Sequence, residues 1–168
     1  DSPKLQNIKK QRVKKLGFND TPVFVPIDFR YDSLSQKLSE YGFDPFQPTF
    51  VSIMGVSYYL MMDTFVDTLS ELHNLMRSEL EIVFDFYDDT ELQKEGSARF
   101  SRLKQLTSEV GEPMAQGYNV GLFKHRLELI GYNLSHMTPD EIENIYFNRN
   151  KTGYQAFENV HFQKPDIR

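Results

Sequence analysis

The sequence predicts an α/β domain with a mostly parallel sheet. Short apolar segments rich in β-branched and aromatic residues, which are typical of buried strands, alternate along the chain with segments of helical periodicity. Strands that are separated by helices need crossover connections, and these favour parallel pairing. The chain has 168 residues and no internal repeat or low-complexity stretch, so its length fits one domain.

The first half of the chain predicts two helices and two strands. Gly17 and Gly42 follow the two helical segments and are suited to ending them, while Asp32 or Ser33 can cap the second helix. The expected elements are, in order, a helix over residues 1–16, a strand over 22–29, a helix that runs to residue 41 and a strand over 49–54.

The second half continues the alternation. Phe65 and Leu69 belong to the apolar face of a long amphipathic helix. Thr138, Pro139 and Glu141 form the pattern of a capping box with proline at the first helical position, which predicts a helix start. The other expected elements are a helix over residues 59–76, a strand over 80–86, a helix over 91–109, a turn at 111–113, a helix over 120–129 and a strand over 157–162.

Composition excludes several classes of protein. The formal net charge is −5, which argues against a nucleic-acid binder because such proteins usually carry a basic excess. The absence of cysteine excludes disulfide scaffolds, cysteine-ligated zinc and thiol nucleophiles. No apolar run is long enough to span a bilayer, and the lysine-rich first segment does not resemble a signal peptide. We therefore expect a soluble cytoplasmic protein with no membrane partner.

Candidate site residues lie where predicted strands end, because ligands of parallel α/β sheets bind there. A carboxylate such as Asp28 can accept a hydrogen bond from an exocyclic amine or a hydroxyl, and Phe29 offers a face for a flat ring. Gly55 would let a ligand approach the backbone closely. Spacing alone nevertheless favours a capping or turn-forming role for Asp28. The three strand ends are Asp28 with Phe29, Met54 with Gly55, and Asp85 with Phe86.

Other chemistry-bearing residues have a structural interpretation as well as a functional one. Tyr58 and Tyr59 could line a pocket, although packing against the following helix is the better interpretation of the pattern alone. Asp85, Asp88 and Asp89 could hold a divalent cation, but their spacing matches no calcium loop and favours a solvated acidic turn. The four histidines are scattered and form no metal motif. The sequence therefore predicts no metal site.

Several short blocks occur in a specific order along the chain. They are Asp-Ser-Pro at residues 1–3, Val-Pro-Ile-Asp-Phe at 25–29, Gly-Phe-Asp-Pro-x-x-Pro-Thr at 42–49, Gly-Val-x-x-Tyr-Leu at 55–60, Gly-Glu-Pro at 111–113 and Tyr-Phe-x-Arg at 146–149. In this order they resemble the leucine carboxyl methyltransferase-like family of class I S-adenosylmethionine-dependent O-methyltransferases. The resemblance covers nearly the whole chain and implies a Rossmann-like class I methyltransferase sheet.

The resemblance also implies a cofactor, S-adenosyl-L-methionine, and residues that bind it. Asp1 matches the acidic position that holds the ribose hydroxyls. Asp28 and Phe29 match the pair that accepts from the adenine amine and contacts its ring. Gly55 and Tyr59 match the loop at the methyl-transfer site. No catalytic residue is assigned by this comparison.

Two departures from the family pattern carry expectations of their own. Members begin with a strand and a glycine-rich turn that hold the methionine end of the cofactor, whereas this chain starts where their second strand ends. Residues 1–168 are therefore expected to be the C-terminal part of one methyltransferase domain. Alone, they should bind the cofactor weakly, transfer no methyl group and self-associate through unpaired strand edges. Met54 is the sixth residue that the resemblance places at the cofactor, and it stands where many members have glutamate.

The expected reaction is methyl transfer to a carboxylate or hydroxyl of a small molecule or peptide. A carboxylate acceptor is anionic and needs no base, whereas a hydroxyl acceptor would need one, for which His125 and His136 are candidates. A non-catalytic, methyltransferase-derived binding or interaction module is the alternative. A nucleotide-binding α/β protein of another family, using Asp28 and Phe29 without methyl transfer, is a third interpretation.

Overall fold

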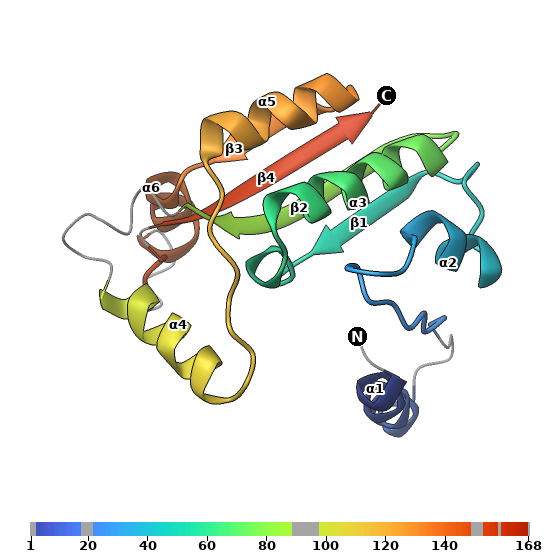
Figure 1. The fold of residues 1–168 in the computed structure, drawn as a ribbon, viewed down its shortest axis with the longest axis horizontal. Helices are drawn as coiled ribbons and strands as arrows, with labels where there is room; N and C mark the ends of the chain where they lie inside the picture. Colours follow the sequence, from blue (N-terminus) through green and yellow to red (C-terminus); the bar gives the residue numbers. More distant parts are fainter. Residues whose placement is uncertain (1–2, 18–21, 89–97, 149–152, 158, 168) are drawn as a thin grey trace.

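A mixed four-stranded sheet forms the centre of the computed structural model (Figure 1), which describes residues 3–17, 22–88, 98–148, 153–157 and 159–167. The strands are β1 (Thr49–Ile53), β2 (Leu80–Tyr87), β3 (Asn133–Met137) and β4 (Val160–Ile167), in the spatial order β1-β2-β4-β3. β1 and β2 are parallel, whereas β4 runs antiparallel to both of its neighbours, β2 and β3. The predicted α/β class is confirmed.

The core lies between this sheet and two helices, α3 (Met62–Leu75) and α5 (Val120–Ile130). Alternate side chains of a strand point to the same face, and in β2 one such set, Leu80, Ile82, Phe84 and Phe86, is fully buried. Phe65 of α3 packs edge-on against Phe84, with ring centroids 5.1 Å apart. Phe123 of α5 lies 5.0 Å from Phe86 in the same way. The two helices thus cover one face of the sheet together.

The remaining helices lie around this core. The 3₁₀ turn η1 (Ser57–Tyr59) follows β1, and α2 (Leu34–Glu40) packs against α3. Phe100 of α4 (Ala98–Glu109) contacts Tyr87 at the end of β2. α1 (Pro3–Lys15) lies apart from the sheet, beyond α2 (Figure 1). The short α6 (Pro139–Ile142) continues into a π-helix, η3 (Glu143–Asn148).

Capping residues in the sequence agree with several helix ends of the structure. The Ser33 side chain accepts a hydrogen bond from the backbone of Gln36 and caps α2. Thr138 and Glu141 form the predicted capping box of α6. Gly131 ends α5 with a φ of 108°, a left-handed conformation that glycine adopts without steric cost.

The structure corrects the predicted strand over residues 22–29. Residues 22–28 carry no regular secondary structure, and a turn follows at residues 29–32. A strand is defined by the ladder it forms with a partner, and none pairs with this segment among the described residues. Pro22 and Pro26 also remove two of the backbone donors that such a ladder would use.

Other boundaries moved, and one strand was missed. The helix predicted from residue 59 begins at Met62, after the 3₁₀ turn, and the last strand begins at Val160 rather than at residue 157. Of the helix predicted over 91–109, the part at 91–97 lies outside the described residues, and α4 covers the rest. β3 was not predicted. Within the described ranges, no helix combines the length and apolar character needed to cross a membrane.

Candidate functional site

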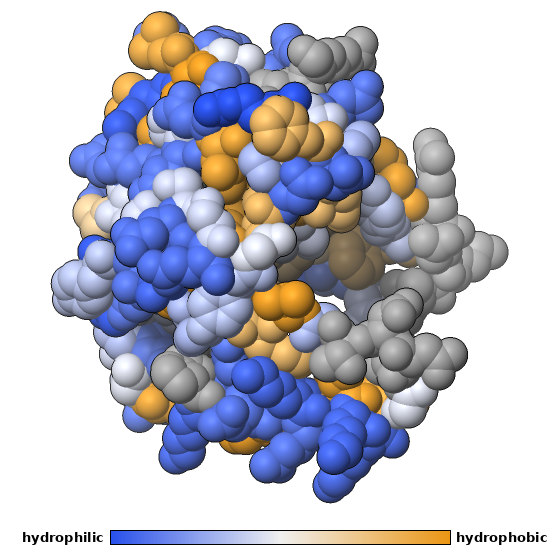
Figure 2. Space-filling view, turned by 90° about the vertical axis from the view of Figure 1, so that its right-hand side faces the viewer, coloured by the Kyte–Doolittle hydropathy of each residue, from blue (hydrophilic) through white to orange (hydrophobic). Residues whose placement is uncertain are grey.

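A cleft of about 860 Å³ opens between three segments that are far apart in the sequence. The segments are residues 26–37, residues 55–60 after β1, and residues 111–113 after α4, and Leu5 of the helix over Pro3–Lys15 adds one further side chain. Figure 2 shows the molecule from the α1 and α2 side, where the surface is hollowed and apolar side chains are exposed between hydrophilic regions. The lining includes Leu5, Pro26, Ile27, Asp28, Phe29, Arg30, Asp32, Lys37, Gly55, Val56, Tyr59, Leu60, Gly111, Glu112 and Pro113.

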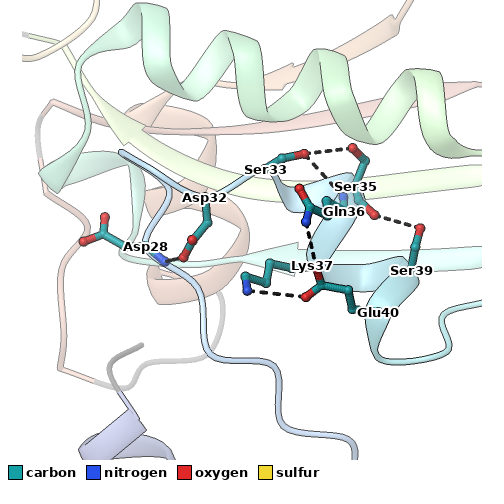
Figure 3. Close-up of polar contacts among 8 residues, drawn as sticks. All are labelled: Asp28, Asp32, Ser33, Ser35, Gln36, Lys37, Ser39 and Glu40. Atoms are coloured by element: carbon teal, nitrogen blue, oxygen red, sulfur yellow. Dashed lines mark hydrogen bonds and ion pairs between the residues drawn. The ribbon is translucent and has the colours of Figure 1, made fainter.

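Asp28 stands at the start of the turn that forms the first wall. Its backbone carbonyl accepts hydrogen bonds from the amides of Tyr31 and Asp32, at 3.0 and 2.9 Å. Its own amide donates to the Asp32 carboxylate at 2.8 Å, as Figure 3 shows. The turn-forming role that spacing favoured for Asp28 is therefore present, and it fixes the backbone that carries the side chain.

The Asp28 carboxylate is held by Arg30. The Arg30 Nε donates to Oδ1 at 2.9 Å and Nη2 donates to Oδ2 at 2.6 Å, a two-pronged pair, while the Arg30 amide donates to Oδ1 at 3.1 Å. These hydrogen bonds and the guanidinium charge lower the pKa of Asp28 to about 2. The site consequently presents an ionised carboxylate at neutral pH.

Arg30→Ala is expected to raise the pKa of Asp28 from about 2 toward 3.8, the value without such partners. Because the folded-state pKa lies below that value, the stabilisation from this pair is present above pH 4 and is lost as pH falls through 2. Carboxyl ¹³C chemical shifts followed against pH would measure the change. Lys37→Ala is the matched control, since Lys37 pairs with Glu40. An unchanged midpoint in Arg30→Ala would contradict the assignment.

The second wall of the cleft is held by Asp85, at the end of β2. Its carboxylate accepts hydrogen bonds from the Gly55 amide and from the Tyr58 hydroxyl, each at 2.7 Å. Its backbone carbonyl accepts from the Ser57 hydroxyl at 2.6 Å. Burial and the neighbouring Asp85 charge raise the pKa of Tyr58, which therefore stays a hydrogen-bond donor. Gly55 has a φ of 70°, which favours glycine at this position.

The third wall is joined to the second. The amide of Ala115 donates to the Tyr58 carbonyl at 2.7 Å. The Tyr118 hydroxyl lies 3.0 Å from the carbonyls of both Ser57 and Leu60. These bonds tie the segment that follows Pro113 to the loop after β1, so the two walls form one unit.

α2 brings Lys37 to the edge of the cleft, and α3 anchors it there. The Glu71 carboxylate of α3 accepts hydrogen bonds from the hydroxyl groups of Ser33 and Ser35 and from the Ser35 amide, at 2.7 to 3.1 Å. Figure 3 shows Ser33 and Ser35 at the beginning of α2 and the Lys37–Glu40 pair one turn later.

Four of the six residues expected to bind a cofactor line the cleft: Asp28, Phe29, Gly55 and Tyr59. Met54 does not line it and is 47% exposed. Asp1 lies outside the described residues. Sequence reasoning did not assign Asp32, Lys37 or the segment at 111–113 to the site. The Gly-Glu-Pro block at 111–113 is the sequence signal that points to that segment.

The other candidates lie elsewhere. His125 is exposed on α5, and the His136 Nδ1 lies 2.9 Å from Oε1 of the buried Gln163; neither histidine lines the cleft. The Asp85 carboxylate is engaged by the cleft wall, Asp88 is buried, and Asp89 lies outside the described residues. Within the described part of the chain, no group of three histidine, aspartate or glutamate side chains is placed to hold a metal ion.

Comparisons of sequence point to one family. The family model for leucine carboxyl methyltransferase matches residues 1–73. A Bacillus subtilis protein, provisionally named S-adenosyl-L-methionine-dependent methyltransferase YktD, is 31% identical over 166 residues, or 96% of this chain. The match covers 54% of that relative, so the chain spans about half of its length. Both matches agree with the resemblance to the leucine carboxyl methyltransferase family that the sequence motifs indicated.

Comparisons of structure define the fold. A DUF574 family protein from Streptomyces avermitilis superimposes with a TM-score of 0.65 at 10% identity, covering 94% of this chain and 61% of that one. A SAM-dependent methyltransferase from Archaeoglobus fulgidus gives 0.53 at 14% identity, covering 94% and 72%. Magnesium protoporphyrin IX methyltransferase from Synechocystis, solved with bound SAH, gives 0.53 at 10% identity, covering 97% and 58%. The fold is that of class I methyltransferases.

Proposed function

We propose that this chain belongs to an S-adenosylmethionine-dependent O-methyltransferase and forms the adenine side of its cofactor site. The observation that carries the proposal is the meeting of Asp28 and Phe29 with Gly55 and Tyr59 in one cleft, although the two pairs are separated by 26 residues or more of sequence. Names of the relatives support the cofactor, since one is named as an S-adenosyl-L-methionine-dependent methyltransferase and another was solved with SAH.

Each of these residues suits its proposed contact. Each oxygen of an ionised carboxylate has about two acceptor sites, so Asp28 can accept from the adenine amine while Arg30 still donates to it. Phe29 supplies an apolar surface for the ring. Gly55 lacks a side chain and leaves its backbone open to close approach, since a Cβ there would meet no atom within 4 Å.

A carboxylate is the acceptor that the cleft favours. The cofactor supplies an activated methyl group, so alignment and desolvation of the acceptor oxygen are the main tasks of the protein. A hydroxyl acceptor would need a base, and neither His125 nor His136 reaches the cleft. Arg30 and Lys37 bring positive charge to the lining, where they pair with Asp28 and Glu40 and share the cleft with the acidic side chains of Asp32 and Glu112. The acceptor we propose is a carboxylate of a small molecule or peptide.

A non-catalytic binding module remains the second candidate. It is favoured by Met54, which stands where many family members carry glutamate and which lies outside the cleft lining. Such a module would hold the cofactor or a related nucleoside in the same cleft but transfer no methyl group. Incubating the product of the intact gene with labelled S-adenosylmethionine and carboxylate acceptors would separate the two, because only an enzyme releases S-adenosylhomocysteine.

Gly55→Ala is expected to weaken the binding of S-adenosylhomocysteine to the product of the intact gene by about fivefold or more. Alanine is strained at a φ of 70°, so the loop after β1 must shift. Isothermal titration calorimetry measures the affinity directly.

Gly42→Ala is the matched control for that experiment. Gly42 has a φ of 80° and an equally open Cβ position, but it does not line the cleft. The control should lose a similar amount of stability and keep its affinity. Equal affinities for Gly55→Ala and the unmodified protein, or an unmodified protein that binds no S-adenosylhomocysteine, would count against the proposed function.

A further inference from the structure

We propose that Asp85 is a positioning residue for the cofactor site: its buried carboxylate fixes the loop from Gly55 to Tyr59 in the shape that forms the cleft wall. This inference rests on the proposed function. Asp85 does not itself line the cleft, and its side chain acts through Gly55 and Tyr58.

Because Asp85 is buried, its hydrogen bonds to Gly55 and Tyr58 limit the movement of the loop. Asp85 is only 8% exposed, and a buried carboxylate that loses a donor leaves a charge poorly solvated. Its two oxygens hold two different groups, the Gly55 amide at the start of the loop and the Tyr58 hydroxyl three residues later, both at 2.7 Å. The loop is thus fixed at two points relative to the end of β2.

The Ser57 and Tyr58 contacts extend this control beyond the loop. The backbone carbonyl of Asp85 accepts from Ser57 at 2.6 Å, which adds a third attachment. The carbonyl of Tyr58 accepts from Ala115, two residues after the Gly-Glu-Pro wall. Asp85 therefore sets the position of the second wall directly and of the third wall through Tyr58.

The chemistry of this position differs from the interpretations that the sequence offered. The sequence pattern favours a solvated acidic turn for Asp85 and allows a cation ligand. Its carboxylate instead accepts from neutral donors of the cleft wall. If Asp85 acts by positioning the loop, cofactor affinity should depend on its hydrogen bonds more than on its negative charge. Asp85→Asn, which keeps the shape and loses the charge, should therefore bind better than Asp85→Ala, which loses both.

The test compares the affinity of S-adenosylhomocysteine with the melting temperature in variants of the intact gene product. Asp85→Ala removes both acceptors and is expected to weaken binding about tenfold or more. Asp85→Asn keeps an acceptor for Gly55 and can donate to the Tyr58 oxygen, so it should retain affinity to within about threefold. Tyr58→Phe removes one attachment and should weaken binding about threefold to tenfold.

Tyr132→Phe provides the matched control. The Tyr132 hydroxyl also donates to a buried acceptor, the Leu69 carbonyl at 2.8 Å, but it lies away from the cleft. This variant should lower the melting temperature about as much as Tyr58→Phe and leave the affinity unchanged. Equal affinities for Tyr58→Phe and Tyr132→Phe, or an Asp85→Ala protein that binds as well as the parent, would overturn the inference.

Amide hydrogen exchange at Gly55 makes the inference testable without a ligand. The Asp85→Asn and Tyr58→Phe proteins, which change the core least, would be compared with the parent. Tyr58→Phe should speed exchange of the Gly55 amide while the β2 amides keep their protection. If the parent binds no S-adenosylhomocysteine, the proposed function fails. The role of Asp85 in shaping the loop is then tested by exchange alone, and unchanged exchange of the Gly55 amide would overturn it.

Discussion

Replacing Phe123 with alanine is expected to lower the free energy of unfolding by about 3–5 kcal/mol, the range for removing a large buried aromatic side chain. Phe123 is fully buried. Its ring lies 5.0 Å from the rings of Phe86 and Tyr118, 5.7 Å from Phe84 and 6.1 Å from Phe65. The substitution would leave a cavity where α3, α5 and the sheet meet.

Leu122→Ala tests whether the effect comes from the core rather than from the helix. Leu122 is the preceding residue of α5 and is 50% exposed, so its truncation should change the unfolding free energy by less than about 0.5 kcal/mol. Urea unfolding of both variants, followed by circular dichroism, makes the comparison. Similar losses for Phe123→Ala and Leu122→Ala would show that the aromatic cluster does not hold α5 on the sheet.

Asp28→Ala should weaken S-adenosylmethionine binding by the intact gene product by about 1–3 kcal/mol, or 5- to 150-fold. The variant removes the acceptor proposed for the adenine amine and leaves the Arg30 guanidinium facing the cleft. Calorimetric titration with S-adenosylhomocysteine would measure the loss.

Asp44→Ala is the comparison for the Asp28 variant. Asp44 also accepts a backbone hydrogen bond in an exposed turn, from the Phe46 amide at 3.0 Å, but it lies outside the cleft lining. Its removal should leave cofactor affinity unchanged. The adenine assignment fails if Asp28→Ala binds as tightly as Asp44→Ala.

Elements governed by local interactions were predicted well from the sequence. The caps at Ser33 and Thr138 depend on residues within one helical turn, so the pattern of residue types determines them. β2 was predicted because its residues form a nearly continuous apolar run, which is typical of a largely buried strand. Elements that depend on a partner far away in the sequence were not predicted correctly. Residues 22–29 have the composition of a strand but no ladder partner in the described structure, whereas polar β3 is a strand because β4 pairs with it.

Some residues of the candidate site could also be found from the sequence, and others could not. The family resemblance selected Asp28, Phe29, Gly55 and Tyr59, and the fold brings them to one cleft. Strand-end reasoning holds for Gly55, which follows β1, but Asp28 and Phe29 end no strand of the described structure. The contribution of Asp85 could not be read from the sequence, because its carboxylate serves Gly55 and Tyr58, which lie 30 and 27 residues earlier. Such a contact follows from the parallel alignment of β1 and β2, which sets the two strand ends side by side.

The three-walled construction of the cleft makes any occupant a non-covalent cross-link between distant parts of the chain. The first part of that wall, residues 26–32, is joined to α1, where Gln6 donates to the Val25 carbonyl at 2.5 Å; we call α1 and residues 22–32 the arm. The other two walls are tied to the end of β2. A ligand that touches all three opposes separation of the arm from the sheet, so mass action would raise the free energy of that opening by about 2.7 kcal/mol at a concentration of 100 Kd. The stability of the arm against this opening is therefore expected to rise with the concentration of ligand.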